Sequence, residues 1–348
     1  MAQPTMEDVA RSAGVSRSLV SLVMRDAPNV SDHRREAVLA AAAGLGYRPN
    51  GLARNLASRQ TMTLGVMIND LHNPFFAEAV DGITEQADRA DYQLLLATGR
   101  KSRAGEAGAI ETFLRLRVDG LILTGATLPT AEIVAAARQC PTVLLSRNVR
   151  SPEIDTVNND ERVGPRLAVQ HLAGLGHVRI AHIDGGAGAG AARRRAGYER
   201  AMRELGFGDA IQVVGGAFTE QTGAAGADAL LTGDDPPTAI FAANDLSAAG
   251  ALYRAEDLGL DVPGDVSIVG YDNTAIAAMH HMSLTTVNQP RQEMGQTAVE
   301  LVLERIGAGR TTPVRHVVTP TLVARSTSGP ARMPGIHTPT KSQKGSPQ

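Results

Sequence analysis

The sequence predicts a small all-α helix-turn-helix head followed by an α/β core of two Rossmann-like lobes. Residues 5–45 read as three short amphipathic helices, whereas from Thr63 onward short β-branched or Leu-rich runs alternate with Ala-rich stretches of helix length. The runs are TLGVMIN, YQLLLATG, DGLILTG, PTVLLS, VRIAHIDG, IQVVGG, TAIFAAND and VSIVGYD, with IDTVNND and LTTVNQP between and after them. These are too many strands for one small sheet, so we expect two similar lobes.

The chain divides into five segments on this basis. We expect a DNA-binding head at 1–48, a hinge helix and linker at 49–61, an amino-terminal lobe at 62–160 plus 289–326, a carboxy-terminal lobe at 161–288 and a disordered tail at 327–348. The tail prediction rests on a composition rich in Pro, Ser, Thr and Gly with no acidic residue.

Composition excludes several functional classes. The single cysteine, Cys140, permits no disulfide framework and no cysteine-based metal site. Aromatic residues make up 3% of the chain and Trp is absent, which argues against stacking platforms for single-stranded nucleic acid. No apolar run approaches the length of a membrane span and no secretory leader is visible, so we expect a cytoplasmic protein without cofactor, metal or membrane contact.

Charge is unevenly distributed along the chain. Residues 1–60 carry eight arginines and five acids, a local balance of +3, although the whole chain has a formal net charge of −2. A small basic head on an acidic body is typical of a protein whose head alone meets a polyanion.

The head has the residue pattern of a helix-turn-helix. Such a motif needs apolar side chains between its helices, a small residue where they cross and a turn residue that tolerates positive φ. Ala10 falls at the crossing, Gly14 falls at the turn, and Thr5 with Asp8 can form a capping box. The buried places are filled by Val9, Ala13, Val15, Val20 and Val23.

A second helix placed in the major groove would present its N-terminal, outward side chains to base edges. We expect Arg17, Ser18, Ser21 and Leu22 to lie there. Phosphate contacts are expected from residues at or near the helix starts, where N–H groups are free. These are Thr5, Ser16, Arg25, Ser31 and His33.

The sequence resembles the LacI/GalR family of bacterial repressors over nearly its whole length. The similar phrases, in the order of that family, are EDVARSAGVSRSLVSLVM, LGYRPNGLARNLAS, NPFFAEAVDGI, RVDGLIL, QHLAGLGHVRIAHIDG, RRRAGYERAM, AIFAANDLSAAGAL and DVSIVGYDN. The resemblance implies a core shaped like periplasmic sugar-binding proteins, with two lobes joined by three crossovers. It also implies a homodimer on a pseudo-palindromic operator, while pairing of dimers into tetramers stays open.

In that family the segment NGLARNLA is a helix only when two copies meet in the minor groove. The resemblance implies that Leu56 is the apolar wedge at the central base step, that Ala53 allows close helix approach and that Asn50 caps the segment. Leu22 departs from the family, where many members have Arg, and leucine can only touch a thymine methyl or fill space. Either the operator differs from the common half-site or Arg17 takes over the guanine contact.

Polar and aromatic residues follow the predicted strands, and ligands of α/β lobes bind at the carboxyl ends of strands. Polyol ligands need forked donors, carboxylate acceptors and a flat apolar face, and these residues supply all three. They include Asn69, Asp70, Asn73, Phe75, Phe76, Ser146, Arg147, Asn244, Asp245 and Asp272. For Asp245 we prefer helix capping to ligand contact.

Carried over residue by residue, the resemblance implies a sugar-like effector held by Asn69, Phe75, Arg147, Arg194, Phe218, Asn244 and Asp272, with Phe76 and Ser146 beside them. Arg194 lies between Arg193 and Arg195, which leaves some risk in the register. Ser146 stands where many sugar-binding members have Asp. Glu161 replaces a common Asn, and we expect it to affect hinge packing rather than ligand contact. Induction and co-repression both stay open.

Three other functions compete with a ligand-controlled repressor. The first is an NAD(P)-dependent enzyme, because Gly186, Gly188 and Ala191 match a minimal G-x-G-x-x-A dinucleotide-binding pattern. Against it, no acidic residue ends the following run, AIQVVGG, to hold a ribose hydroxyl. A sugar receptor without DNA binding would have the same cleft, although the helix-turn-helix argues against it. An activator or architectural DNA-binding protein with a vestigial cleft is the third alternative.

Overall fold

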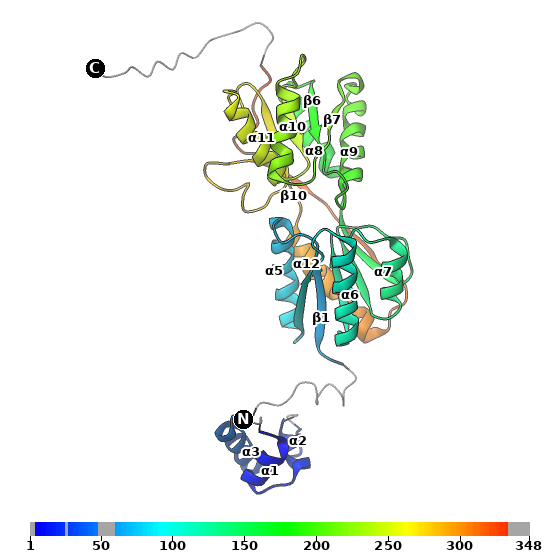
Figure 1. Cartoon of the computed structure of the whole chain (residues 1–348), viewed down its shortest axis with the longest axis vertical. Helices are drawn as coiled ribbons and strands as arrows, with labels where there is room; N and C mark the ends of the chain where they lie inside the picture. Colours follow the sequence, from blue (N-terminus) through cyan, green and yellow to red (C-terminus); the bar gives the residue numbers. More distant parts are fainter. Residues whose placement is uncertain (1–3, 25–26, 48–59, 333–348) are drawn as a thin grey trace, which may run out of the picture. The chain divides into compact units, whose positions relative to one another are not determined.

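The computed structural model describes residues 4–24, 27–47 and 60–332. The chain divides into two compact units, Met1–Met62 and Thr63–Gln348, each described here by itself (Figure 1). None of the helices in the described ranges is long and apolar enough to cross a membrane.

The first unit contains α1 (Met6–Ala13), α2 (Arg17–Met24) and α3 (Asp32–Leu45). Their shared core is apolar and almost free of aromatic side chains, because small helices crossing closely leave room only for short residues. The fully buried members are Val9, Ala10, Val20, Val23, Val30, Val38 and Ala42, while Ala13 and Val15 pack against them half-buried. The helix-turn-helix prediction is therefore confirmed in its packing.

Two local features determine where α1 begins and ends. The Thr5 hydroxyl accepts a hydrogen bond from Asp8 N and the Asp8 carboxylate accepts one from Thr5 N, which completes the predicted capping box. Gly14 ends the helix at φ 65°, a conformation that glycine adopts without steric cost. The turn then delivers the chain to α2.

The amino-terminal lobe of the second unit is built on a parallel sheet in the order β11-β5-β4-β3-β1-β2. Its strands are β1 (Thr63–Ile68), β2 (Gln93–Thr98), β3 (Gly120–Thr124), β4 (Thr142–Leu145), β5 (Ile154–Asn159) and β11 (Arg315–Val318). Helices α5 (Pro74–Arg89) and α12 (Arg291–Ala308) pack together on one face. The other face carries α6 (Arg103–Leu116) and α7 (Thr130–Ala137).

The carboxy-terminal lobe repeats this plan in the order β12-β10-β9-β8-β6-β7. Its strands are β6 (Ile180–Ile183), β7 (Gln212–Val214), β8 (Ala239–Ala242), β9 (Ser267–Asp272), β10 (Thr285–Asn288) and β12 (Thr321–Val323). Its helices are α8 (Val163–Gly174), α9 (Ala191–Glu204), the 3₁₀ turn η1 (Gly208–Ala210), α10 (Glu220–Leu231) and α11 (Asp245–Asp257). Alternate residues of each central strand face α10 and α11 or α8 and α9, as the two-residue period of a strand requires.

The chain passes between the lobes three times: after β5, after β10 and after β11. All ten strand runs read from the sequence are strands, and the last helix, α12, ends at Ala308. The predicted α/β core of two Rossmann-like lobes is therefore confirmed, and residues at the carboxyl ends of strands from both sheets line one pocket.

The C-terminal boundaries differ from the prediction. Residues up to 326 were expected in the amino-terminal lobe, but β12 pairs antiparallel with β10 and so belongs to the carboxy-terminal lobe. The tail was expected to be disordered from 327, yet Thr327 is buried and bonded to both strands beside it: Ile268 N donates to its carbonyl at 2.7 Å and Thr285 N to its hydroxyl at 2.9 Å. Residues 333–348 lie outside the described part.

After Thr327, the Gly329 carbonyl accepts a hydrogen bond from the Ser267 hydroxyl, and the Ala331 N–H donates to Leu175 O at 2.8 Å. Composition misled the prediction because these small polar residues satisfy backbone and hydroxyl groups at the first residues of β9 and β10, a role that hydrophobicity does not report.

Truncating the chain after Ser326 should lower the free energy of unfolding by about 2–4 kcal/mol, since buried backbone and hydroxyl groups lose their partners at about 1–3 kcal/mol each. Truncation after Arg332 keeps every contact described above and is the matched control. Urea denaturation of both proteins measures the difference; equal stabilities would contradict the assignment.

Candidate functional site

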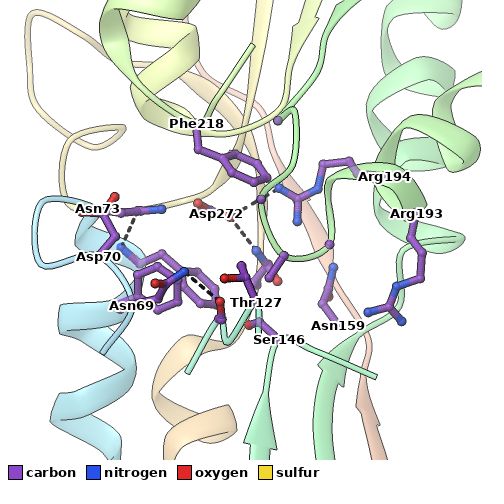
Figure 2. Close-up of a pocket in the computed structure, with 18 of the residues that line it drawn as sticks. Asn69, Asp70, Asn73, Thr127, Ser146, Asn159, Arg193, Arg194, Phe218 and Asp272 are labelled. Atoms are coloured by element: carbon purple, nitrogen blue, oxygen red, sulfur yellow. Dashed lines mark hydrogen bonds and ion pairs between the residues drawn. The ribbon is translucent and has the colours of Figure 1, made fainter. Parts of the chain in front are cut away.

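A pocket of about 310 Å³ lies between the lobes, a size typical of sites for one small molecule. Its walls come from loops at the carboxyl ends of strands in both sheets (Figure 2). The lining residues are Asn69, Asp70, Asn73, Phe75, Phe76, Lys101, Gly125, Thr127, Ser146, Asn158, Asn159, Glu161, Gly185, Ala187, Gly188, Ala189, Gly190, Arg193, Arg194, Ala217, Phe218, Asp272 and Gln289.

Asn69, at the end of β1, begins the amino-terminal wall. Its Nδ2 donates to Gly125 O at 2.9 Å, which fixes the orientation of the amide. Its Oδ1 is buried and has no hydrogen-bond partner among the described residues. Gly125 is required because a Cβ there would lie 2.6 Å from the ring of Phe76. The ring of Phe76 thus packs directly against the loop after β3.

Four lining residues other than glycine adopt left-handed backbone conformations that L-residues avoid. They are Lys101 at φ 50°, Ser146 at φ 65°, Phe218 at φ 57° and Asp272 at φ 105°. Each follows or ends a strand, and each left-handed residue outside glycine costs of order 1–3 kcal/mol. Concentration of such strain around one cavity is typical of a functional site.

The glycine-rich loop between β6 and α9 serves the packing of Phe218. A Cβ on Gly185 or Gly188 would lie 2.3 or 2.4 Å from the Phe218 ring, so only glycine permits this close approach. In the G-x-G-x-x-A pattern, Gly188 therefore has this steric cause, while a Cβ on Gly186 would lie 2.4 Å from Gly216 O. The ring forms part of the pocket wall (Figure 2).

Arg194, in the first turn of α9, is buried and fully engaged by the protein. Its Nε and Nη2 donate to Glu161 Oε2 and Oε1 at 3.1 and 2.7 Å, and its Nη1 donates to Ala243 O at 2.5 Å. The guanidinium carbon lies 3.6 Å from the ring centroid of Tyr271. Burial alone would lower the pKa of Arg194, but the charge of Glu161 reverses the direction and raises it.

Asp272 ends β9 close to the same arginine. Gln289 Nε2 donates to its Oδ1 at 2.5 Å, and Arg194 Nη1 lies 3.9 Å away. Burial raises the pKa of Asp272 to about 7, with the charge of Arg194 lowering it and that of Asp245 raising it. Burial therefore favours the protonated form of this carboxyl, against the pull of Arg194 toward the ionised form.

Seven of the nine predicted effector residues line the pocket: Asn69, Phe75, Phe76, Ser146, Arg194, Phe218 and Asp272. Arg147 and Asn244 lie outside its lining. Arg147 instead donates to the carbonyls of Ala126 and Leu128, which fixes the loop after β3. Asn244 caps α11, accepting from Ser247 N at 2.9 Å, and supports the Phe218 carbonyl with its Nδ2.

Asp245 was expected to cap the helix, but Asn244 is the N-cap and the Asp245 side chain turns inward. It accepts hydrogen bonds from Thr274 N, the Thr274 hydroxyl and the Thr286 hydroxyl. Burial raises its pKa to about 6.

Sequence reasoning missed Asn159, Thr127, Lys101 and Gln289 as lining residues and assigned Glu161 to hinge packing. Asn159 is the last residue of β5, within the run IDTVNND, so the strand-end rule could have included it. Glu161 lies in the pocket and holds Arg194 across 33 residues of sequence, a pairing that no local pattern reveals.

In the head, Arg17 and Ser18 are exposed in the first turn of α2, and Leu22 is 39% exposed. Ser16 Oγ accepts a hydrogen bond from Leu19 N at 3.2 Å, so its side chain caps the helix. Ser21 is half-buried, while Thr5, Ser31 and His33 are exposed at the helix starts. Arg25, Asn50, Ala53 and Leu56 lie outside the described residues.

Comparison with known proteins identifies one domain in the head and another in the two-lobed core. Residues 5–50 match the profile of bacterial regulatory proteins of the lacI family, and residues 169–328 match a periplasmic binding protein-like domain. The catabolite control protein A of Priestia megaterium is 37% identical over 86% of this chain and 91% of its own length.

Solved structures show the same architecture. The lac repressor dimer bound to operator and the anti-inducer ONPF has a TM-score of 0.86 and 30% identity, covering 94% of this chain and all of that one. The transcriptional regulator CelR in complex with cellobiose has a TM-score of 0.70 and 33% identity over 93% of this chain and all of that one.

The fold and the pocket define a DNA-binding transcriptional regulator controlled by a small molecule. The chain belongs to the lacI family of bacterial regulatory proteins.

The raised pKa of Asp272 predicts a specific pH dependence of stability. Its pKa in the folded state lies above its value in the unfolded state. Its contribution to the free energy of unfolding is therefore fully present below about pH 4 and is lost as the pH rises through about 7, at up to about 1.4 kcal/mol per pH unit. Asp272→Asn removes this titration. The groups facing it are Arg194, Asp245, Gln289 and Arg291.

Urea denaturation at pH 5 and pH 7 measures the effect. The free energy of unfolding of wild type minus that of Asp272→Asn should be smaller at pH 7 than at pH 5. A difference that is independent of pH would show that Asp272 is ionised throughout.

Proposed function

We propose that this chain represses transcription by binding a pseudo-palindromic operator as a homodimer, under the control of a sugar-like effector in the inter-lobe pocket. One observation carries the proposal: a single chain combines an exposed polar first turn on α2 with a strained, polar and aromatic pocket between two lobes. The operator-bound lac repressor dimer and the CelR–cellobiose complex support both halves.

The DNA side of the proposal rests on the first turn of α2. Arg17 can donate two hydrogen bonds to a guanine and Ser18 can pair with several bases. Leu22 contributes an apolar contact suited to a thymine methyl. We assign phosphate contacts to Thr5, Ser16, Ser31, His33 and Arg25, and we assign Asn50, Ala53 and Leu56 to a minor-groove hinge with Leu56 as the wedge.

The effector side rests on the chemistry of the pocket wall. Phe76 and Phe218 offer flat apolar faces, while Asn69, Ser146 and Asp272 offer hydrogen-bonding groups, the combination that a sugar ring with its hydroxyls requires. We assign no catalytic group to this pocket. Action on an operator places the protein in the cytoplasm.

Coupling between the pocket and the head requires that the lobes move as units. Glu78 on α5 connects them: its Oε1 accepts from Ala275 N at 2.9 Å, and its Oε2 pairs with Arg291 Nη2 at 2.6 Å. Ala275 follows β9 in the carboxy-terminal lobe, and Arg291 begins α12. A ligand that changes the closure of the lobes must shift this contact, and so the amino-terminal lobes of the dimer.

Arg17→Ala should relax base preference at one position of each half-site and lower operator affinity at least ten-fold, because a bidentate contact to guanine is worth about 1–3 kcal/mol per half-site.

Leu56→Ala should lower affinity for operators that need bending, whatever the sequence of their half-sites. Selection of bound duplexes from a random pool, followed by titration at fixed salt, measures both.

Arg11→Ala is the matched control, since Arg11 is an exposed arginine on α1 that pairs with Asp8 at 3.3 Å. It should leave base preference unchanged. The proposal fails if Arg17→Ala and Arg11→Ala give the same selected sequence and affinity as wild type.

A further inference from the structure

Glu161 places a carboxylate where an α/β lobe would bind an anionic ligand. The N-terminus of α9 and the guanidinium of Arg194 converge there, and both features attract anions. Glu161 Oε1 lies 3.6 Å from the Cβ position of Gly190, the N-cap of α9, and both of its oxygens accept from Arg194. The protein therefore fills this position with its own negative charge.

The pair is closed to further charge. Side-chain exposure is 5% for Arg194 and 9% for Glu161, and the remaining terminal nitrogen of Arg194 donates to Ala243 O with Asp272 close by. A phosphate or carboxylate of a ligand would have to displace Glu161 or lie beside it unpaired. Either costs several kcal/mol, because a buried charge without a partner is strongly disfavoured.

Glu161 also determines the direction of a hydrogen-bond chain along the pocket wall. An ionised carboxylate only accepts, so Tyr271 Oη donates to Glu161 Oε2 at 3.2 Å. The same hydroxyl then accepts from Asn159 Nδ2 at 2.5 Å. The amide of Asn159 is thereby oriented with its Oδ1 left as an acceptor.

Three oxygens of the wall are buried with no partner among the described residues: Asn69 Oδ1, Asn159 Oδ1 and Ser146 Oγ. The two amide oxygens can only accept, since the nitrogen of each amide is already committed to the protein. Burying such acceptors without partners costs about 1–3 kcal/mol each. A ligand that satisfies them must bring O–H or N–H donors.

The other cations of the wall do not restore an anion site. Lys101 Nζ pairs with Asp70 at 2.5 Å. Arg193 lies exposed, where water screens its charge, and its Nη2 donates to Asn158 Oδ1 at 3.4 Å.

We propose that Glu161 is a built-in anion that selects uncharged, donor-rich ligands such as polyols and excludes their phosphorylated or carboxylated relatives. This assignment rests on the proposed function, since it specifies the ligand of the same pocket. It makes Glu161 a specificity-determining residue and Arg194 the guanidinium that Glu161 withholds from the ligand.

Isothermal titration with inorganic phosphate and glucose 6-phosphate tests the proposal on the full-length protein without DNA. Wild type should bind neither anion measurably at millimolar concentration. Glu161→Ala, which opens space and frees Arg194, should bind both at least ten-fold more tightly than wild type. The double variant Glu161→Ala/Arg194→Met should lose that gain.

Glu199→Ala is the control. Glu199 is a carboxylate on α9 that also pairs with an arginine, Arg195, at 3.0 Å, but it does not line the pocket. It should gain nothing. Glu161→Gln keeps the side-chain volume and tests the charge alone if the alanine variant melts early; it too should bind phosphate at least ten-fold more tightly.

Tight phosphate binding by wild type, or folded Glu161 variants that gain none, would overturn the proposal. Neither outcome depends on operator binding, so the regulatory function stands or falls separately.

Discussion

The buried ion pair between Arg194 and Glu161 is the interaction on which the pocket depends. Two charges are removed from water at the junction of the lobes, which costs several kcal/mol per ion unless each satisfies the other. The bidentate geometry supplies that satisfaction. Because Glu161 lies in the first crossover and Arg194 on α9, the pair also connects the segment that joins the lobes to the body of one of them.

Other features of the wall follow from the position of this pair. Tyr271 lies under the guanidinium and donates to the carboxylate, while Phe218 is 5.7 Å from the guanidinium carbon and fits only because the loop before α9 is glycine-rich. Asp272 is left beside a cation already neutralised by Glu161, so burial prevails and raises its pKa. The packing of Phe218 and the protonation of Asp272 thus both depend on the position of the Arg194–Glu161 pair.

The sequence predicted the elements well because they depend on local signals. Short β-branched or Leu-rich runs identified every strand of the two sheets except the short strands β11 and β12. Those two are assigned to their lobes by pairing with β5 and β10, far away in sequence. The ordered residues 327–332 escaped prediction for the same reason, since their partners lie on β9, on β10 and after α8.

The candidate site was predictable where backbone topology alone places a residue. Asn69, Ser146 and Asp272 lie in the pocket because they end strands, whereas Arg147 and Asn244 satisfy the same rule and turn their side chains to backbone groups instead. Side-chain direction depends on which buried carbonyl or N–H lacks a partner, and a sequence does not show this. Glu161 shows most clearly what sequence alone does not predict, because its role depends on Arg194, an arginine in another element.

The central claim is that occupancy of the pocket by a neutral ligand controls the affinity of the head for DNA. Its most direct test measures operator affinity as each of a panel of neutral sugars is added, and the affinity of any active sugar for free and operator-bound protein. The account predicts that a neutral sugar changes operator affinity by about 5–150-fold and that operator changes the affinity for that sugar by the same factor. Control by a sugar phosphate while its neutral parent is inactive, or equal sugar affinity for free and operator-bound protein, would contradict it.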